Sequence, residues 1–287
     1  MSMLKKRFLL DKNPNGFPFH PCVHPIANRK LARIHLPVAK NCNLICRYCF
    51  RQHPNSKRNL PGTSNGVMSP EQALNHLCRQ RKIWGRNAIV GISGPGEPLA
   101  NPETFETLRL VKTKFRSHPM CLCTNGLLLR DRVDDLYDIG MSVISITING
   151  VNPKIVKILQ PGIKLGKVLP LGEKAAICLI KAQMEGLKMA VARNMFVKVN
   201  TVVAEEINDG HLMDLARIVA DIGAGMMNIM PVIPPHAKSP LKPPDRVKIE
   251  TLRNECEKVI PQFRLCRQCS SDAAGIPGQM KKGGCCL

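Results

Sequence analysis

Three cysteines are spaced in a way that could hold an iron–sulfur cluster. Cys42, Cys46 and Cys49 form a Cys-x3-Cys-x2-Cys loop, which supplies three thiolates where a cubane four-iron cluster has four irons to ligate. The fourth iron would be open to a small chelating molecule. Zinc is the alternative, but structural zinc sites take four protein ligands and favour Cys-x2-Cys pairs. A disulfide framework fits less well, because three cysteines cannot pair evenly.

A short segment rich in glycine and proline could hold part of such a molecule. Residues 93–98 read Ser-Gly-Pro-Gly-Glu-Pro. Gly94, Pro95 and Gly96 would let the backbone approach a ligand, and Glu97 offers a carboxylate to an ammonium group. By itself the segment is a turn signal. Together with the cysteine loop it indicates a site for an amine-bearing ligand.

The elements that must position these residues alternate along the chain. Short apolar, β-rich runs are followed by capped amphipathic stretches, which predicts six βα units and a parallel sheet. The expected strands are 32–39, 87–93, 119–124, 142–148, 195–203 and 226–232. The expected helices begin near Ser69, Asn101, Asp131, Gly172, Asn208 and Asp245. Most chemically suggestive residues then follow strand ends, where βα barrels carry their active sites.

Two internal segments and both ends break this alternation. Residues 50–67 are polar and rich in turn formers, and the prolines of 231–244 predict an extended loop. Residues 1–31 and 264–287 show no strand pattern. Both carry cysteines, namely Cys22, Cys266, Cys269, Cys285 and Cys286. We expect 1–31 to cover the mouth of a barrel formed by 32–263, and 264–287 to form a cysteine-rich tail.

Composition narrows the class of protein. The 287 residues include 13 cysteines, and no signal peptide or apolar run of membrane-spanning length is apparent, which predicts a reduced, cytoplasmic setting. With 42 basic and 21 acidic residues the net charge is +21, which suits nucleic acid, an anionic cluster or an acidic partner protein. Only 11 residues are aromatic, so base-stacking platforms are poorly supplied.

The motifs taken together resemble a known family. The cysteine loop with residues 93–98 is similar to the radical S-adenosylmethionine (SAM) enzymes. Further runs, in order and with compatible gaps over about residues 17–278, resemble the NifB-type nitrogenase cofactor-maturation proteins, without the C-terminal carrier domain of many members. These runs are His20-Pro21-Cys22, 33–39, 93–100, 121–127, 146–149, 197–202, 228–234 and 266–273.

The resemblance implies an α/β fold, a partial (βα)6 barrel of radical SAM type with cysteine-bearing extensions. It implies that Cys42, Cys46 and Cys49 ligate a [4Fe-4S] cluster that cleaves SAM to a 5′-deoxyadenosyl radical. Glu97 and its loop would hold the SAM amine, with Tyr48 beside the adenine. Further residues implied to bind the cofactor are Asn125, Thr147, Asn149 and Asn200.

NifB-type proteins also fuse two substrate four-iron clusters into an eight-iron carbide core, with SAM as carbon source. The resemblance implies that His35 and Cys121 ligate the first substrate cluster. It assigns Cys22, Cys266 and Cys269 to the second. Implied partners are cluster-donating and cofactor-accepting assembly proteins and an electron donor, with no membrane and with nucleic acid disfavoured.

Ordinary structural roles compete with these assignments. His35 lies in an apolar strand, where a hydrogen-bonded core histidine is common. One of Cys121 and Cys123 is expected to face the core as a small apolar side chain. Cys285 and Cys286 fit a flexible terminus.

The chain also departs from the NifB pattern. Asn55 stands where another cysteine is expected, and Ser270 replaces an arginine. The first substrate cluster therefore lacks one ligand, for which His53 or Cys123 could substitute. Three alternatives stay open: an RNA- or protein-modifying radical SAM enzyme, a cluster carrier without radical chemistry, and a NifB-like paralogue that serves another metallocofactor.

Overall fold

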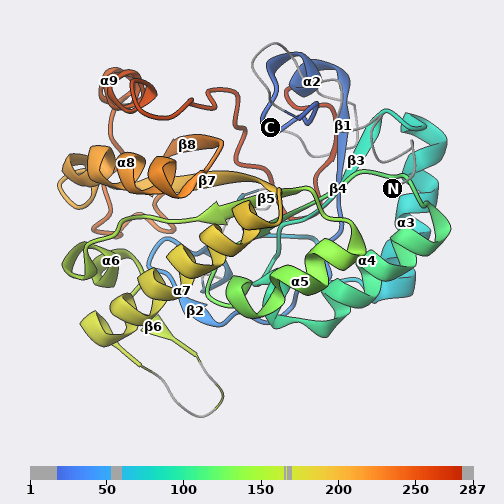
Figure 1. Cartoon of the computed structure of the whole chain (residues 1–287), viewed down its shortest axis with the longest axis horizontal. Helices are drawn as coiled ribbons and strands as arrows, with labels where there is room; N and C mark the ends of the chain where they lie inside the picture. Colours follow the sequence, from blue (N-terminus) through green and yellow to red (C-terminus); the bar gives the residue numbers. More distant parts are fainter. Residues whose placement is uncertain (1–17, 53–59, 165, 167–169, 280–287) are drawn as a thin grey trace.

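A computed structural model describes residues 18–52, 60–164, 166 and 170–279. Its centre is a seven-stranded sheet with the order β8-β7-β5-β4-β3-β1-β9 (Figure 1). All strands from β1 to β8 in this order are parallel, and β9 pairs antiparallel with β1. The strands are β1 (Ala32–His35), β3 (Ala88–Ile92), β4 (Met120–Thr124), β5 (Val143–Thr147), β7 (Phe196–Val203), β8 (Met226–Pro231) and β9 (Ala274–Gly275).

Helices connect successive strands, and α4, α5 and α7 run along one side of the sheet (Figure 1). This is the arrangement that parallel βα units require, since each crossover must return the chain to the same end. The main helices are α3 (Pro70–Trp84), α4 (Pro102–Lys114), α5 (Leu129–Ile139), α7 (Gly172–Ala192), α8 (Leu212–Ile222) and α9 (Arg246–Glu257). Shorter elements are α2 (Pro25–Lys30), α6 (Pro153–Leu159), β2 (Leu44–Ile45), β6 (Gly162–Ile163), η1 (Phe50–Gln52), η2 (Pro98–Ala100) and η3 (Asp209–His211).

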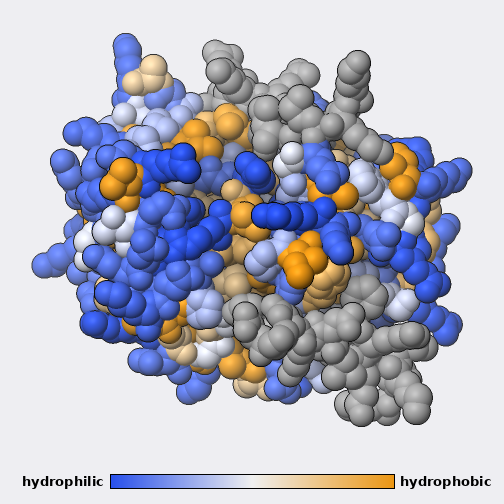
Figure 2. All heavy atoms as spheres, turned by 90° about the horizontal axis from the view of Figure 1, so that it is seen from above, coloured by the Kyte–Doolittle hydropathy of each residue, from blue (hydrophilic) through white to orange (hydrophobic). Residues whose placement is uncertain are grey.

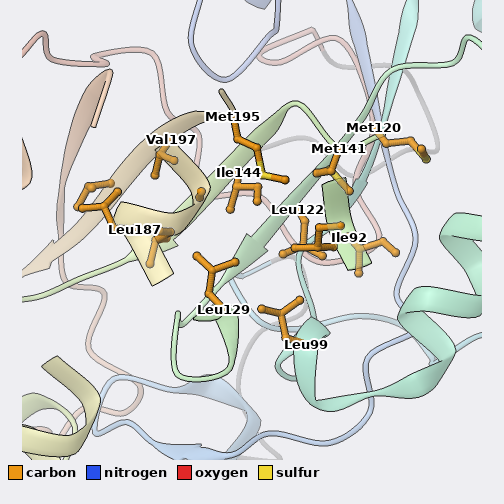
Figure 3. Packing of buried hydrophobic residues seen from close by; sticks show 14 of the residues in the cluster. Ile92, Leu99, Met120, Leu122, Leu129, Met141, Ile144, Leu187, Met195 and Val197 are labelled. Carbon is orange, nitrogen blue, oxygen red and sulfur yellow. The ribbon is translucent and has the colours of Figure 1, made fainter. Parts of the chain in front are cut away.

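The core lies between the sheet and these helices (Figure 3). Leu122 on β4 and Ile144 on β5 pack there with Leu129 and Leu187 from the helices. Along β4 the side chains alternate between buried and half-buried, because neighbouring residues of a strand point to opposite faces. The second face of the sheet is thereby left for polar and thiol side chains.

The expected α/β fold with six parallel strands is confirmed, each strand falling inside its predicted range. The start of α3 is also as predicted: Ser69 caps it in a capping box with Gln72. Residues 233–244 contain no helix, in line with their prolines.

Three details differ from expectation. The helix expected near Asp131 begins at Leu129, and the one expected near Asn208 begins as the 3-10 turn η3 before α8. The absence of a strand from the C-terminal segment is wrong, because β9 lies there. A two-residue strand depends on its partner β1 and not on any pattern of its own.

The surface seen in Figure 2 is largely hydrophilic, with hydrophobic side chains in small groups between polar ones. The described helices include none that is both long and apolar enough to cross a membrane.

Candidate functional site

A cavity of about 310 Å³ opens on the polar face of the sheet. It is lined by residues from the strands, from the cysteine loop and from both ends of the described chain. All eight predicted metal ligands line it: Cys22, His35, Cys42, Cys46, Cys49, Cys121, Cys266 and Cys269. Seven of the nine predicted cofactor-binding residues line it as well: Tyr48, Pro95, Gly96, Glu97, Asn125, Thr147 and Asn200.

The cysteine loop is held at the cavity by pairing with a distant hairpin. Strand β2 within the loop pairs antiparallel with β6, and the Arg47 amide donates to the Leu159 carbonyl at 2.9 Å. Burial raises the pKa of the Cys42 and Cys46 thiols. These thiols would therefore be protonated without metal and would lose their protons on ligation.

Gly96 joins the 93–98 segment to the chain that leads into the cysteine loop. Its amide donates to the Ala39 carbonyl at 2.6 Å, and the Glu97 amide donates to the Asn41 carbonyl at 2.8 Å. A Cβ at Gly96 would stand 2.1 Å from the Asn41 oxygen. This backbone contact therefore requires glycine at position 96. The close approach of a ligand, which the sequence analysis expected here, is not needed to explain the glycine.

Gly94 contacts the C-terminal segment. It has φ of +130°, and a Cβ on it would lie 2.7 Å from the Ser271 hydroxyl. The peptide bond from Gly94 to Pro95 is cis. The neighbouring residues Ser93 and Pro95 line the cavity, and the Ser271 hydroxyl donates to the Ser93 carbonyl at 3.3 Å.

Glu97 is a buried carboxylate at the cavity. Its Oε2 accepts from the Asn125 amide at 2.7 Å, and its Oε1 accepts from the Leu99 amide at 3.1 Å and from the Thr124 hydroxyl. Burial raises its pKa to about 7, against the lowering effect of these hydrogen bonds. A cation beside it would favour the charged form.

Polar side chains hold the adenine side of the predicted SAM site. The Tyr48 hydroxyl accepts from Asn149 Nδ2 at 2.8 Å, and Asn149 Oδ1 accepts from the Val202 amide at 2.9 Å. Asn200 Oδ1 accepts from Asn228 Nδ2 at 2.9 Å. Asn149 therefore reaches the cavity through Tyr48.

His35 and Cys121 face one another across a glycine. The register places His35 of β1 beside Gly91 of β3, and Gly91 beside Cys121 of β4. A Cβ at Gly91 would lie 2.9 Å from His35 Cδ2 and 3.2 Å from Cys121 Sγ. The missing side chain is what gives both groups room on this face.

The geometry also indicates which His35 nitrogen is available. His35 Nδ1 lies 2.9 Å from the Ser270 carbonyl, which can only accept. Nδ1 therefore carries the hydrogen, and Nε2 keeps the lone pair that a metal needs. Burial, then the charge of Arg33, lowers the pKa of His35. His35 can therefore be both a hydrogen-bonded histidine, through Nδ1, and a metal ligand, through Nε2.

Arg33 brings the cysteines of the two terminal segments together. Its Nη2 donates to Cys269 Sγ at 2.9 Å and its Nη1 to Cys22 Sγ at 3.7 Å. Cys266 lies beside Met230, with 3.5 Å between the sulfurs. Burial opposes ionisation of Cys22, but Arg33, a bond with His20 and Lys198 hold its pKa well below the ordinary value.

Arg33 and Lys198 are site residues that the sequence analysis missed. Both are buried, and Lys198 Nζ donates to the Cys22 carbonyl at 3.0 Å and lies 5.0 Å from the centre of the Phe263 ring. The sequence could have indicated both residues. Arg33 lies two residues before His35 and Lys198 two residues before Asn200, so each shares a strand face with a predicted site residue. Two positive charges thus lie at the thiol-lined cavity.

The apolar packing expected of one of Cys121 and Cys123 is found for Cys121, which packs against the cluster of Ala27, Leu31 and Ile89. Both cysteines line the cavity, because residues two apart on a strand share a face. Their neighbours Met120 and Leu122 are the core residues. His53, Asn55, Cys285 and Cys286 lie outside the described residues.

The donor set fits an iron–sulfur cluster and SAM. Soft thiolates suit iron–sulfur clusters, and Glu97 offers a buried carboxylate to an amine. In the part of the chain that is described, no three His, Cys, Asp or Glu side chains converge on a single-ion position. A four-iron cluster spreads its ligands over separate irons, so it does not need such convergence.

The chain is similar to known proteins along most of its length. The sequence model of the Radical SAM superfamily matches residues 36–219. A protein named FeMo cofactor biosynthesis protein NifB from Methanocaldococcus jannaschii is 38% identical over 263 residues, 91% of this chain and 87% of that protein. The chain belongs to the NifB family of radical SAM enzymes. A NifB from Methanocaldococcus infernus is 39% identical, over 90% of this chain and 85% of its own length.

Longer relatives and solved structures extend the comparison. NifB of Klebsiella pneumoniae is 36% identical over 91% of this chain, which spans 57% of that protein. A radical SAM methyltransferase from Sphaerobacter thermophilus superposes with a TM-score of 0.61 at 19% identity, over 83% of this chain and 66% of its own. At that identity the similarity shows the fold alone. Membership of the family implies a [4Fe-4S] cluster and SAM as cofactors.

Proposed function

We propose that this protein acts in FeMo cofactor biosynthesis, as the names of its NifB relatives state for them. In the proposed reaction two four-iron substrate clusters are fused into a carbide-containing eight-iron precursor, with SAM as carbon source and radical generator. One observation carries the proposal. Thiols from four separated parts of the chain, the loop at 42–49, strand β4 and the two terminal segments, line the same cavity as Glu97.

The chain's own residues have separable tasks in this proposal. Cys42, Cys46 and Cys49 would hold the [4Fe-4S] cluster, which when bound supplies the electron that cleaves SAM. Glu97 would orient the methionyl ammonium, and Tyr48, fixed by Asn149, would bound the adenine side. The apolar lining of the cavity, including Ile92 and Leu122, would exclude water from a radical.

Arg33 and Lys198 would receive the negative charge of the substrate clusters. A cluster with thiolate ligands is anionic, and a buried anion needs a paired charge. Both cations already lie next to Cys22. The net charge of +21 would favour acidic donor and acceptor proteins outside the cavity.

SAM cleavage tests the radical step. Anaerobically reconstituted, reduced protein should form 5′-deoxyadenosine from SAM, and Cys46→Ala should abolish this. Cys178→Ala is the matched control, because Cys178 is exposed on α7. Product formation at the parental rate in Cys46→Ala would contradict the assignment of the cysteine loop.

Iron content tests the cluster-fusion step. The parental protein should bind about twelve irons, three four-iron clusters. The triple change of Cys22, Cys266 and Cys269 to Ala should remove about four of them. An unchanged iron content after the triple change would leave a radical SAM enzyme with another substrate, such as RNA or a protein.

A further inference from the structure

Cys123 is a cavity thiol with no assigned role. It lies two residues after Cys121 on β4 and lines the same cavity. Two residues of a strand span about 6.6 Å, so the thiols stand side by side. Its neighbours in the sequence, Leu122 and Thr124, are fully buried, and Leu122 packs in the core. A cysteine that only filled the core would occupy their face.

Burial raises the pKa of the Cys123 thiol to about 11, and the charge of Lys198 acts against that rise. Asn200 Nδ2 donates to its sulfur at 3.4 Å. In the register of the sheet Cys123 pairs with Ser145, and Ser145 with Lys198. Hydrogen bonds to sulfur and a nearby positive charge both stabilise the ionised form. Lys198 thus provides the counter-charge for a ligand at this position.

A third donor lies on the same face. His35 and Cys121 flank Gly91, and the His35 nitrogen with the lone pair is Nε2, 3.4 Å from the position of a Gly91 Cβ. Cys121 therefore has His35 on one side, across the strands, and Cys123 on the other, along its own strand. The three donors therefore lie on adjoining parts of the same cavity wall.

We propose that His35, Cys121 and Cys123 form a three-ligand site for a four-iron substrate cluster, with Cys123 as the third ligand. The inference rests on the proposed function and deepens it. Both thiols release their protons when they bind iron, and no electron transfer is needed for ligation. The site is built on strands β1 and β4 of the central sheet and needs no residue from 53–59.

The test compares reconstituted full-length parental protein with Cys121→Ser and Cys123→Ser. Serine keeps the size of the side chain and removes the soft ligand. Each change should lower the iron content by up to about four irons per chain. Circular dichroism and the thermal unfolding temperature of the metal-free proteins should stay unchanged. Cys178→Ser is the control that should keep all the iron.

A spectroscopic signature separates ligation from a structural effect. Pulsed EPR of the reduced parental protein should detect nitrogen coupling from a histidine ligand, which His35→Ala removes. Cys123→Ser should also lose or alter this coupling, because both residues would bind the same cluster.

The two proposals can fail separately. Full iron content and unaltered nitrogen coupling in Cys123→Ser, with iron lost in Cys121→Ser, would overturn the role of Cys123 alone. Iron for one cluster only in the parental protein would overturn the cluster-fusion function and this site together. Histidine coupling that persists in His35→Ala would overturn the site as drawn.

Discussion

At the scale of residues, the cavity combines acidic, basic and thiol groups. Burial would disfavour the charged form of each of these groups if it had no partner. Glu97 is bonded to Asn125 and Leu99, while Arg33 lies between Cys22 and Cys269. Burying a charge is costly unless it is paired and hydrogen-bonded. These hydrogen bonds and charge pairs reduce that cost for the buried groups of the cavity.

Glu97 should make the stability of the metal-free protein depend on pH. Its pKa is raised by burial from 4.5 to about 7. The folded state therefore holds the Glu97 proton more tightly than the unfolded state does. This stabilises the fold fully below pH 4.5, and the contribution is lost as the pH rises through about 7. The loss is on the order of 3 kcal/mol. Glu97→Gln should remove this part of the pH profile, measured by urea unfolding at several pH values.

The same residue should control SAM affinity. Only ionised Glu97 pairs with an ammonium group, so binding to parental protein should strengthen as pH rises towards and past 7. Glu97→Gln should weaken binding roughly tenfold or more and flatten this pH dependence. Calorimetric titration of reconstituted protein measures both. Equal affinity and an equal pH profile would exclude an amine partner for Glu97.

Arg33 should keep Cys22 reactive. Because burial alone would raise the pKa of Cys22 and Arg33 is the largest lowering influence, Arg33→Met should decrease the thiolate fraction. Alkylation of Cys22 by iodoacetamide at pH 7 in metal-free protein should slow by roughly tenfold or more. Peptide mass spectrometry measures it, with Cys178 as internal reference. An unchanged rate would contradict the electrostatic role of Arg33.

At the scale of elements, loops around the cavity are fixed to each other by backbone contacts. The 93–98 segment is bonded to 39–41, and the cysteine loop is paired through β2 and β6. The C-terminal segment is bound through β9 and through Asp272, which accepts from the Asn65 amide and side chain at 2.8 Å. Displacement of one loop should therefore move the ligands of another.

Gly96→Ala should show this coupling. A methyl group 2.1 Å from the Asn41 oxygen cannot be accommodated without moving the backbone. We expect a loss of about 2 kcal/mol or more in unfolding free energy and less iron on Cys42, Cys46 and Cys49. Gly66→Ala is the control, because a Cβ there meets nothing within 4 Å, and it should change stability by less than about 0.5 kcal/mol. Equal stability of the two variants would refute the coupling.

At the scale of the whole molecule, the excess of basic residues is spread over the chain. Such a surface attracts polyanions without reading their sequence. Few aromatic residues are present to stack on bases. We therefore propose that the charge serves anionic clusters and acidic partner proteins.

RNA binding should consequently be weak and electrostatic. Affinity for two unrelated RNAs of equal length should be similar, and it should fall by orders of magnitude between about 50 and 200 mM salt. Filter binding measures this affinity, with a protein of neutral net charge as the negative control. Preference for one RNA that persists at about 200 mM salt would favour the RNA-modifying alternative.

The sequence by itself determined the local parts of this protein. Apolar runs with capped helices between them predicted all six parallel strands, since period and capping are encoded by neighbouring residues. The spacing of Cys42, Cys46 and Cys49 likewise indicated the cluster chemistry before any fold was known. Helix starts such as Leu129 were less well defined, because several residues near the end of a helix can begin it.

The tertiary structure alone decided which distant groups meet. The contact of Arg33 with Cys22 and Cys269 joins residues up to 236 positions apart, and the space that Gly91 leaves between His35 and Cys121 depends on the register of three strands. Strand β9 exists only through β1. Register and loop closure are set by packing over the whole chain, so no local pattern encodes them.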